Sequence, residues 1–157
     1  MQKNRVDVIS LGCYKNLVDS EKLMRLFKNA GFKVFHDSDK VCGEFVVVNT
    51  CGFIGDAKQE SIDIILELTE LKKRGRIGKL IVMGCLSERY IHQLEQEIPE
   101  VDAYYGKFNW SDMIDDFVAQ RKNEKSSKDL RVVTTPAHYA YLKIAEGCNR
   151  TCSYCAI

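Results

Sequence analysis

The chain has 157 residues, of which 45% are hydrophobic and 29% are charged, and its formal net charge is +1. This composition is typical of one compact domain with an apolar core, and the near-neutral charge argues against direct nucleic-acid binding by this segment. The sequence has no apolar run long enough for a membrane span or a secretory signal. We therefore predict a cytoplasmic protein with no membrane partner. Disulfides are disfavoured in that compartment, so the seven cysteines suggest metal or redox chemistry.

Short apolar, β-branched runs alternate with helical patterns over the first 120 residues. Near-continuous apolar runs of this kind are typical of strands that are covered on both faces of a parallel sheet. The predicted strands cover 5–12, 45–50 and 79–84, with weaker candidates at 33–37 and 102–106. The pattern predicts an α/β fold with a parallel sheet.

Four helices are predicted between and after these strands. The first contains Leu23 and Phe27 at helical spacing and ends at Gly31, which suits the left-handed conformation of a C-terminal cap. The second ends in the basic run 72–79, which we interpret as a solvated helix end. The predicted capping residues are Asp56 with Gln59 for the second helix, Ser87 for the third, and Asn109 or Ser111 for the fourth.

The sequence changes character after residue 119. Residues 120–129 are polar and charged without an apolar period, which predicts a surface connection. Two further strands are predicted at 130–135 and 141–147. We therefore divide the chain into a first domain (1–120), a linker (121–138) and the beginning of a second domain (139–157).

Three cysteines follow predicted strands directly: Cys13, Cys51 and Cys85. The carboxyl ends of parallel strands lie at one edge of a sheet, where ligands bind, so we expect the three thiols to meet there. Each cysteine also precedes a predicted helix, whose N-terminus favours the thiolate. A glycine beside each cysteine leaves room for a bulky group. The alternative interpretation is that these cysteines are small buried hydrophobic residues.

The last residues of the chain contain a second cysteine motif, CNRTCSYC, with Cys148, Cys152 and Cys155 at C-x3-C-x2-C spacing. Three thiolates at this spacing can bind three irons of a 4Fe-4S cluster and leave the fourth iron open. A zinc site with His138 as the fourth ligand is the alternative.

The residues around these cysteines resemble those of a known family. AEGCNRTCSYC, with Tyr154 before the last cysteine, resembles the signature of radical S-adenosylmethionine (SAM) enzymes. The segments SLGCYKNLVDSE, VNTCGFIGDAKQESID and VMGCLSERY resemble the three cysteine motifs of the methylthiotransferases within that superfamily. The resemblance covers essentially the whole chain. It implies a flavodoxin-like, doubly wound parallel sheet followed by the first strand and the cluster loop of an incomplete radical SAM barrel.

The resemblance also implies roles for individual residues. Cys13, Cys51 and Cys85 are the expected ligands of an auxiliary 4Fe-4S cluster. Cys148, Cys152 and Cys155 are the expected ligands of the 4Fe-4S cluster that binds S-adenosylmethionine, and Tyr154 is expected near the adenine of that cofactor. Asn49 and Thr50 are candidates for hydrogen bonds to cluster sulfur or to the local turn.

Other family residues receive structural interpretations. Helix caps and first-turn acids explain Asn16, Asp19, Ser20 and Glu21 without a catalytic role. Cys42 matches no family motif and is interpreted as a bystander.

Within the family, GC-x-KN-x-VDSE and HYAYLKIAEGC resemble the members that methylthiolate the β-carbon of an aspartate in a small-subunit ribosomal protein. The tRNA-modifying members usually have methionine where this chain has Lys15. A flavodoxin or ferredoxin is the expected electron donor. We expect the chain alone to be inactive, because most of the barrel and a small C-terminal domain are missing. The alternatives are a tRNA adenosine methylthiotransferase and a non-catalytic iron–sulfur or zinc module.

Overall fold

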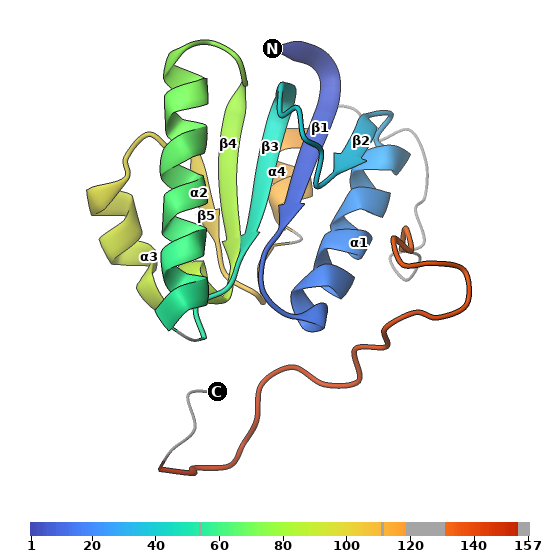
Figure 1. Cartoon of the computed structure of the whole chain (residues 1–157), viewed down its shortest axis with the longest axis vertical. Helices are drawn as coiled ribbons and strands as arrows, with labels where there is room; N and C mark the ends of the chain where they lie inside the picture. The colour runs from blue at the N-terminus through green and yellow to red at the C-terminus, as the bar shows by residue number, and fades with distance from the viewer. Residues whose placement is uncertain (54, 111, 119–130, 154–157) are drawn as a thin grey trace.

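A computed structural model describes residues 1–53, 55–110, 112–118 and 131–153 of the protein. Five strands form one sheet, in which every pairing is parallel and the order is β2-β1-β3-β4-β5 (Figure 1). The strands are β1 (Gln2–Ser10), β2 (Lys33–His36), β3 (Gly43–Thr50), β4 (Lys79–Gly84) and β5 (Ala103–Tyr105). This is the flavodoxin-like strand order, so the predicted fold class and all five strands of the sheet are confirmed.

Helices cover both faces of the sheet. They are α1 (Tyr14–Asn29), α2 (Gly55–Lys73), α3 (Cys85–Glu97) and α4 (Asp112–Val118). Helices α1 and α4 pack on one face, and α2 and α3 pack on the other (Figure 1). The fold is therefore three-layered and doubly wound. Among the described residues, none of the helices combines the length and apolar character that crossing a membrane requires.

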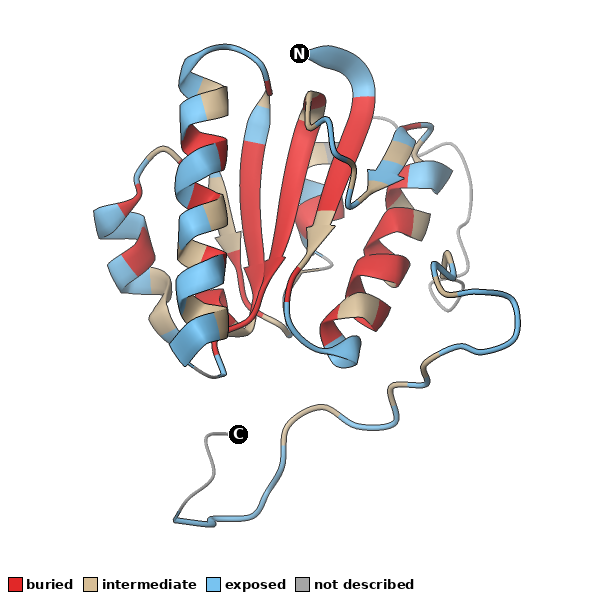
Figure 2. Cartoon of the chain, in the orientation of Figure 1, coloured by how far each residue is buried: buried red, intermediate tan, exposed pale blue. Residues whose placement is uncertain are grey.

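The central strands are buried on both faces, as Figure 2 shows. Side chains of a strand alternate between its two faces. Phe45 and Val47 of β3 accordingly join the core under α1, whereas Val46 and Val48 join the core under α2. This double burial explains why the strand sequence is a continuous apolar run rather than an alternating one.

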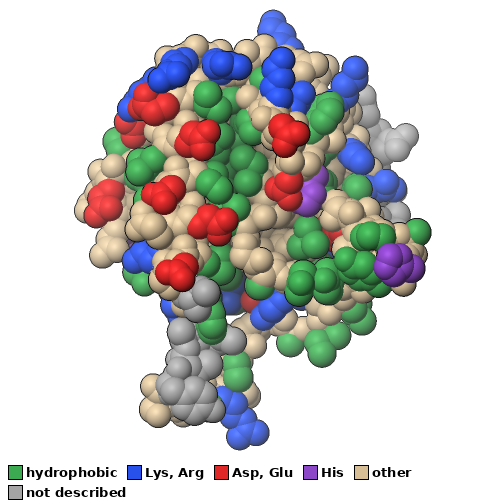
Figure 3. Space-filling model, in the orientation of Figure 1, with side chains coloured by type: hydrophobic (Ala, Val, Ile, Leu, Met, Phe, Trp, Pro, Cys, Tyr) green, Lys and Arg blue, Asp and Glu red, His purple; other side chains and the backbone are tan. Residues whose placement is uncertain are grey.

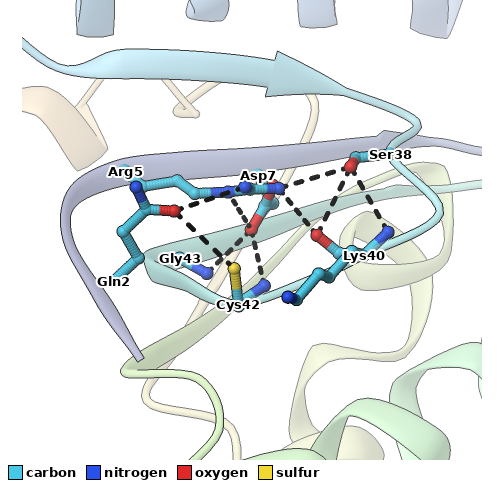
Figure 4. A network of polar contacts seen from close by, with 7 residues as sticks. All are labelled: Gln2, Arg5, Asp7, Ser38, Lys40, Cys42 and Gly43. Atoms are coloured by element: carbon cyan, nitrogen blue, oxygen red, sulfur yellow. Dashed lines mark hydrogen bonds and ion pairs between the residues drawn. The ribbon is translucent and has the colours of Figure 1, made fainter.

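A buried ion pair fixes the loop that leads from β2 to β3, at the amino end of the sheet (Figure 4). Asp7 on β1 accepts a hydrogen bond from Arg5 at 2.7 Å and two more from the backbone N–H groups of Cys42 and Gly43, at 2.9 and 2.7 Å. Arg5 also donates to the carbonyl oxygen of Lys40 at 2.6 Å. Cys42 thus precedes β3 at the amino end of the sheet, opposite to the edge where Cys13, Cys51 and Cys85 lie.

Basic side chains lie along the rim at the amino ends of the strands, at the top of Figure 3. Two lysines at the end of α2 form ion pairs: Lys72 with Asp102 at 2.6 Å, and Lys73 with Glu70 and Glu100, both at 3.1 Å. The basic run at 72–79 therefore has local electrostatic partners within the fold.

The end of α1 was predicted correctly, and the start of α3 was not. Gly31 follows α1 with a φ of +86°, as a left-handed cap requires. Helix α3 begins two residues before Ser87, directly after Gly84. Ser87 therefore lies inside the helix, and its buried hydroxyl has no partner in the described part of the chain.

The predicted cap of α2 also differs from the structure, as does Asn109, one of the two predicted caps of α4. Asp56 lies in the first turn of α2, and the side chain of Gln59 donates to Asp63 at 2.8 Å rather than folding back on the helix start. Helix α4 begins at Asp112, whose N–H binds the backbone carbonyl of Asn109. Ser111 is outside the described residues.

Residues 131–153, which we call the arm, contain no strand. The prediction of strands at 130–135 and 141–147 is therefore wrong for the described residues. A strand needs the backbone of a neighbouring strand to pair with, and the arm instead contacts side chains of α1. It leaves the side of α1 and passes beneath the carboxyl ends of the strands (Figure 1).

Candidate functional site

The carboxyl edge of the sheet brings together three cysteines from three loops. Cys13 is the N-cap of α1, Cys51 follows β3 directly, and Cys85 is the first residue of α3. Cys13 and Cys51 flank the switch point between β1 and β3, which is where flavodoxin-like sheets bind ligands. The topology thus places the first three predicted site residues at one edge.

Glycines allow these loops to approach one another closely. A Cβ at Gly12 would lie 2.4 Å from Cβ and 2.8 Å from Sγ of Cys51, and a Cβ at Gly52 would lie 2.8 Å from the backbone of Leu86. A Cβ at Gly84 would lie 2.5 Å from Oδ1 of Asn49. We expected these glycines to leave room for a bulky ligand. The structure fills that room with the chain's own atoms, and the glycines bring the cysteine loops together.

Asn16 connects the three loops. Its Nδ2 donates to the carbonyl oxygens of Leu11, at 3.0 Å, and Thr50, at 2.9 Å. Its Oδ1 lies 3.7 Å from the thiol of Cys85, which donates to it. The interpretation of Asn16 as a cap residue is wrong, because the N-cap of α1 is Cys13. One buried amide therefore holds the loops of all three cysteines.

The neighbouring polar residues point into the protein rather than toward the thiols. Nδ2 of Asn49 donates to the carbonyl oxygen of Asn16 and to the hydroxyl of Ser20, at 2.8 and 3.0 Å. The hydroxyl of Thr50 donates to the carbonyl oxygen of Met83 at 2.6 Å. Of the two roles considered for Asn49 and Thr50, these bonds support the local structural one.

The electrostatics of Cys85 differ from the expectation. Burial raises the pKa of the Cys85 thiol, and this outweighs the opposing effect of the Lys107 ammonium group. Cys51 and Cys13 raise the pKa further, which means that the three thiols lie close enough to interact. Burial and the neighbouring thiols therefore favour the protonated form of Cys85. A metal would have to displace its proton on binding.

Among the described residues, no group of three or more His, Cys, Asp or Glu side chains has the arrangement that would hold one metal ion. A 4Fe-4S cluster binds each thiolate through a different iron, so its ligands stand farther apart than those of one ion. Thiolates are the ligands that iron–sulfur clusters require, and the three cysteines of this edge supply three of them. The residues present thus suit such a group.

The chain is similar to known proteins along its whole length. The model of a family described as "Uncharacterized protein family UPF0004" matches residues 5–106. The chain belongs to this family. It is also 64% identical over 157 residues to the ribosomal protein uS12 methylthiotransferase RimO of Parabacteroides distasonis, and 63% identical to that of Porphyromonas gingivalis. RimO of Cytophaga hutchinsonii is 49% identical over 156 residues.

The similarity covers all, or 99%, of this chain, but the chain spans only 35–36% of the length of these RimO proteins. The UPF0004 match includes the sheet and the cysteines of its carboxyl edge, and it ends at Gly106. The arm is therefore outside that family match and within the similarity to the RimO sequences.

Two cysteines of the second motif of this UPF0004 protein lie on the arm. Cys148 and Cys152 are both exposed, and the N–H of Arg150 lies 3.4 Å from the sulfur of Cys148. Cys155 and Tyr154 are outside the described residues. His138, the alternative zinc ligand, has its ring 5.1 Å from that of Tyr139.

Two acids of α1 bind the arm, a role that we did not predict. Glu21 accepts hydrogen bonds from the backbone N–H and the hydroxyl of Thr134, at 2.7 and 2.9 Å, and pairs with Arg131 at 3.3 Å. Asp19 pairs with Lys143 at 2.6 Å. The signal in the sequence was the presence of two acids on the buried face of α1, where a cap or a solvated acid is not expected.

A pocket of about 350 Å³ separates the arm from the end of β1. It is lined by Ser10, Gly12, Cys13, Tyr14, Leu17, His36, Asp37, Thr134, Thr135, Pro136 and Tyr139. The wall of the pocket thus includes Cys13 and joins the carboxyl edge to the arm.

Proposed function

We propose that this chain is part of a radical SAM methylthiotransferase. The complete protein would transfer a methylthio group to the β-carbon of an aspartate in the small-subunit ribosomal protein uS12. The observation that carries the proposal is the meeting of Cys13, Cys51 and Cys85 at one sheet edge, with a second cysteine motif on an arm bound to the same helix as Cys13. The names of the similar RimO proteins support the choice of reaction and substrate.

We propose two 4Fe-4S clusters and S-adenosylmethionine as cofactors. Cys13, Cys51 and Cys85 would hold the auxiliary cluster. Cys148, Cys152 and Cys155 would hold the cluster that binds S-adenosylmethionine, with Tyr154 beside the adenine. When bound, these groups supply the electron transfer and the radical and sulfur chemistry that amino-acid side chains lack.

The chain's own residues would prepare the first site in two ways. Asn16 fixes the spacing of the three loops through its hydrogen bonds. Lys107, which favours the thiolate form of Cys85, would offset part of the negative charge of a thiolate-bound group. Together these residues hold and neutralise the ligand set.

The remaining parts of the proposal concern the complete protein. We propose that uS12 is recognised by segments outside these 157 residues and that the chain alone does not complete the reaction, since it spans about a third of its relatives' length. A flavodoxin or ferredoxin would donate electrons, and the reaction would take place in the cytoplasm. We keep the division into 1–120, 121–138 and 139–157 as part of this proposal.

Metal analysis of the 157-residue chain tests the proposal. We expect about eight irons and eight sulfides per chain after anaerobic reconstitution, falling to about four of each in Cys51→Ala. Cys42→Ala is the matched control, because Cys42 lies at the opposite end of the sheet, and it should leave the metal content unchanged. Zinc in place of iron, or equal loss in both variants, would show that the assignment of the site is wrong.

The substrate is tested separately with the complete protein. Reconstituted enzyme with S-adenosylmethionine and a reductant should add the mass of a methylthio group to uS12 and leave tRNA unmodified. Modification of tRNA alone would favour the tRNA adenosine methylthiotransferase.

A further inference from the structure

The arm contains a cluster of charged residues just before the second cysteine motif. Glu146 lies two positions before Cys148 and contacts three lysines. Its Oε1 lies 3.2 Å from Nζ of Lys107 and 3.6 Å from Nζ of Lys15, and its Oε2 contacts Lys143. We call Glu146 with these three lysines the Glu146 cluster.

The cluster joins the second cysteine motif to the site of the first three cysteines. Lys15 lies two residues after Cys13 on α1, and Lys107, which follows β5, interacts electrostatically with Cys85. Glu146 also contributes to the electrostatic environment of Cys85. A single carboxylate of the arm is thus held by one cation from the first turn of α1, beside Cys13, and by another from the segment after β5.

Two neighbouring contacts set the direction of the arm. Lys143 is bound to Asp19 at 2.6 Å, and the side chains of this pair are only 11% and 8% exposed. The ring of Tyr141 stacks on that of Tyr14, with 4.0 Å between centroids and an angle of 17°. Tyr14 is the residue after Cys13.

The arm has little apolar burial to hold it in this place. Leu142 and Ile144, which alternate with Tyr141 and Lys143, are 82% and 88% exposed. Burial of apolar surface is the usual force that orders a segment, and in the arm it acts through Val132, which packs against the core, and through the stacked ring of Tyr141. Electrostatic contacts therefore determine where the residues before Cys148 lie.

We propose that Glu146 is a positioning residue that holds the residues before the second cysteine motif at the edge of the first three cysteines. This inference rests on the proposed function, because it concerns the relative placement of the two proposed cluster sites. Glu146 acts through the lysines and does not contact the reacting groups.

NMR relaxation of the metal-free, reduced 157-residue chain tests the proposal without any enzymatic activity. In the unaltered chain, the backbone of residues 141–147 should have order parameters near the rigid value of about 0.85. In Glu146→Gln these values should fall below about 0.6, while those of the sheet stay unchanged. Glu146→Asp, which keeps the charge on a shorter side chain, should give intermediate values.

Glu95→Gln is the matched control. Glu95 is an exposed acid of α3, and its one ion pair within the described residues is with His92. This variant should leave the arm unchanged. Order parameters that are unchanged in Glu146→Gln, or that fall equally in Glu95→Gln, would overturn the proposal.

A second measurement uses the complete protein with its clusters reduced. Iron content should be the same with and without Glu146→Gln, whereas the magnetic interaction between the two clusters, seen as broadening in electron paramagnetic resonance, should weaken. Unchanged broadening would overturn the positioning role and leave the proposed function intact. Failure to bind iron would overturn the proposed function, and the NMR result would still decide whether Glu146 holds the arm.

Discussion

Two buried ion pairs at opposite ends of the sheet have nearly the same geometry and different surroundings. Arg5 and Asp7 are 2.7 Å apart, and Lys143 and Asp19 are 2.6 Å apart. Asp7 also accepts two backbone N–H bonds and closes a loop between core strands. Asp19 instead binds Lys143 of the arm, and burial raises the pKa of Asp19 although Lys143 opposes this. The same kind of contact therefore fixes the fold in one place and attaches a segment to it in the other.

This difference separates two kinds of order within one chain. The sheet and its helices are held by apolar burial on both faces, and Asp7 belongs to that cooperative unit. The arm is held by ion pairs, by the hydrogen bonds of Glu21, by one aromatic stack and by Val132, which packs against the core. We therefore expect the arm to detach from the sheet and helices without unfolding them.

The largest effect is expected for Asp7→Ala. This change leaves the Arg5 guanidinium without its carboxylate and removes the acceptor for the N–H groups of Cys42 and Gly43. Breaking a buried pair in this way should lower the free energy of unfolding by about 3 kcal/mol. Urea unfolding followed by circular dichroism measures it.

Asp19→Asn is the counterpart at the other end of the sheet. Because burial disfavours the charge of Asp19, and because an amide oxygen still accepts a hydrogen bond from Lys143, removal of that charge should shift the urea midpoint little. If Asp19→Asn destabilises the chain as much as Asp7→Ala, the two ion pairs do not differ in the way that we infer.

A smaller loss of stability is expected when Gly12 or Gly31 is replaced by alanine, and comparing the two replacements separates backbone strain from crowding at the cysteine edge. Gly12 and Gly31 both have a φ of +86°, but nothing lies within 4 Å of a Cβ at Gly31, whereas a Cβ at Gly12 would meet Cys51. Gly31→Ala should cost about 1 kcal/mol through strain alone. Gly12→Ala should cost about 2 kcal/mol and also reduce the iron bound after reconstitution. Equal costs with full iron content would show that the contact between Gly12 and Cys51 is not required.

The elements of the sheet could be predicted because their signals are local. A continuous apolar run such as 45–50 is compatible with double burial in a parallel sheet, and strand ends then place Cys51 and its counterparts at one edge. The prediction of Ser87 as an N-cap failed because the start of α3 depends on the backbone conformation of Gly84, which the pattern of residue types does not indicate. Gly84 adopts a φ of +105° and allows α3 to start at Cys85.

The contacts of the arm could not be read from local pattern at all. Asp19 and Lys143 are 124 residues apart in sequence, and Glu21 and Thr134 are 113 apart. Exposed and less exposed side chains do alternate around 141–147, since Leu142 and Ile144 are exposed. A strand also needs a neighbouring strand to pair with, and this alternation does not supply one.

The smallest expected effect is the pH dependence of arm docking. Burial alone would raise the pKa of Glu146, but hydrogen bonds from Lys143 and Lys107 outweigh it and lower the pKa from 4.5 to about 2. A lowered carboxyl pKa stabilises the docked arm fully above pH 4.5, and this stabilisation is lost as the pH falls toward 2. Asp19, whose pKa is raised by burial, acts in the opposite sense and reduces the change. The order parameters of residues 141–147 should thus stay constant from pH 7 to 5 and decrease when the pH is lowered below 4.5. In Glu146→Gln this decrease at acid pH should be absent. A fall that begins above pH 5 would mean that a group other than Glu146 controls the arm.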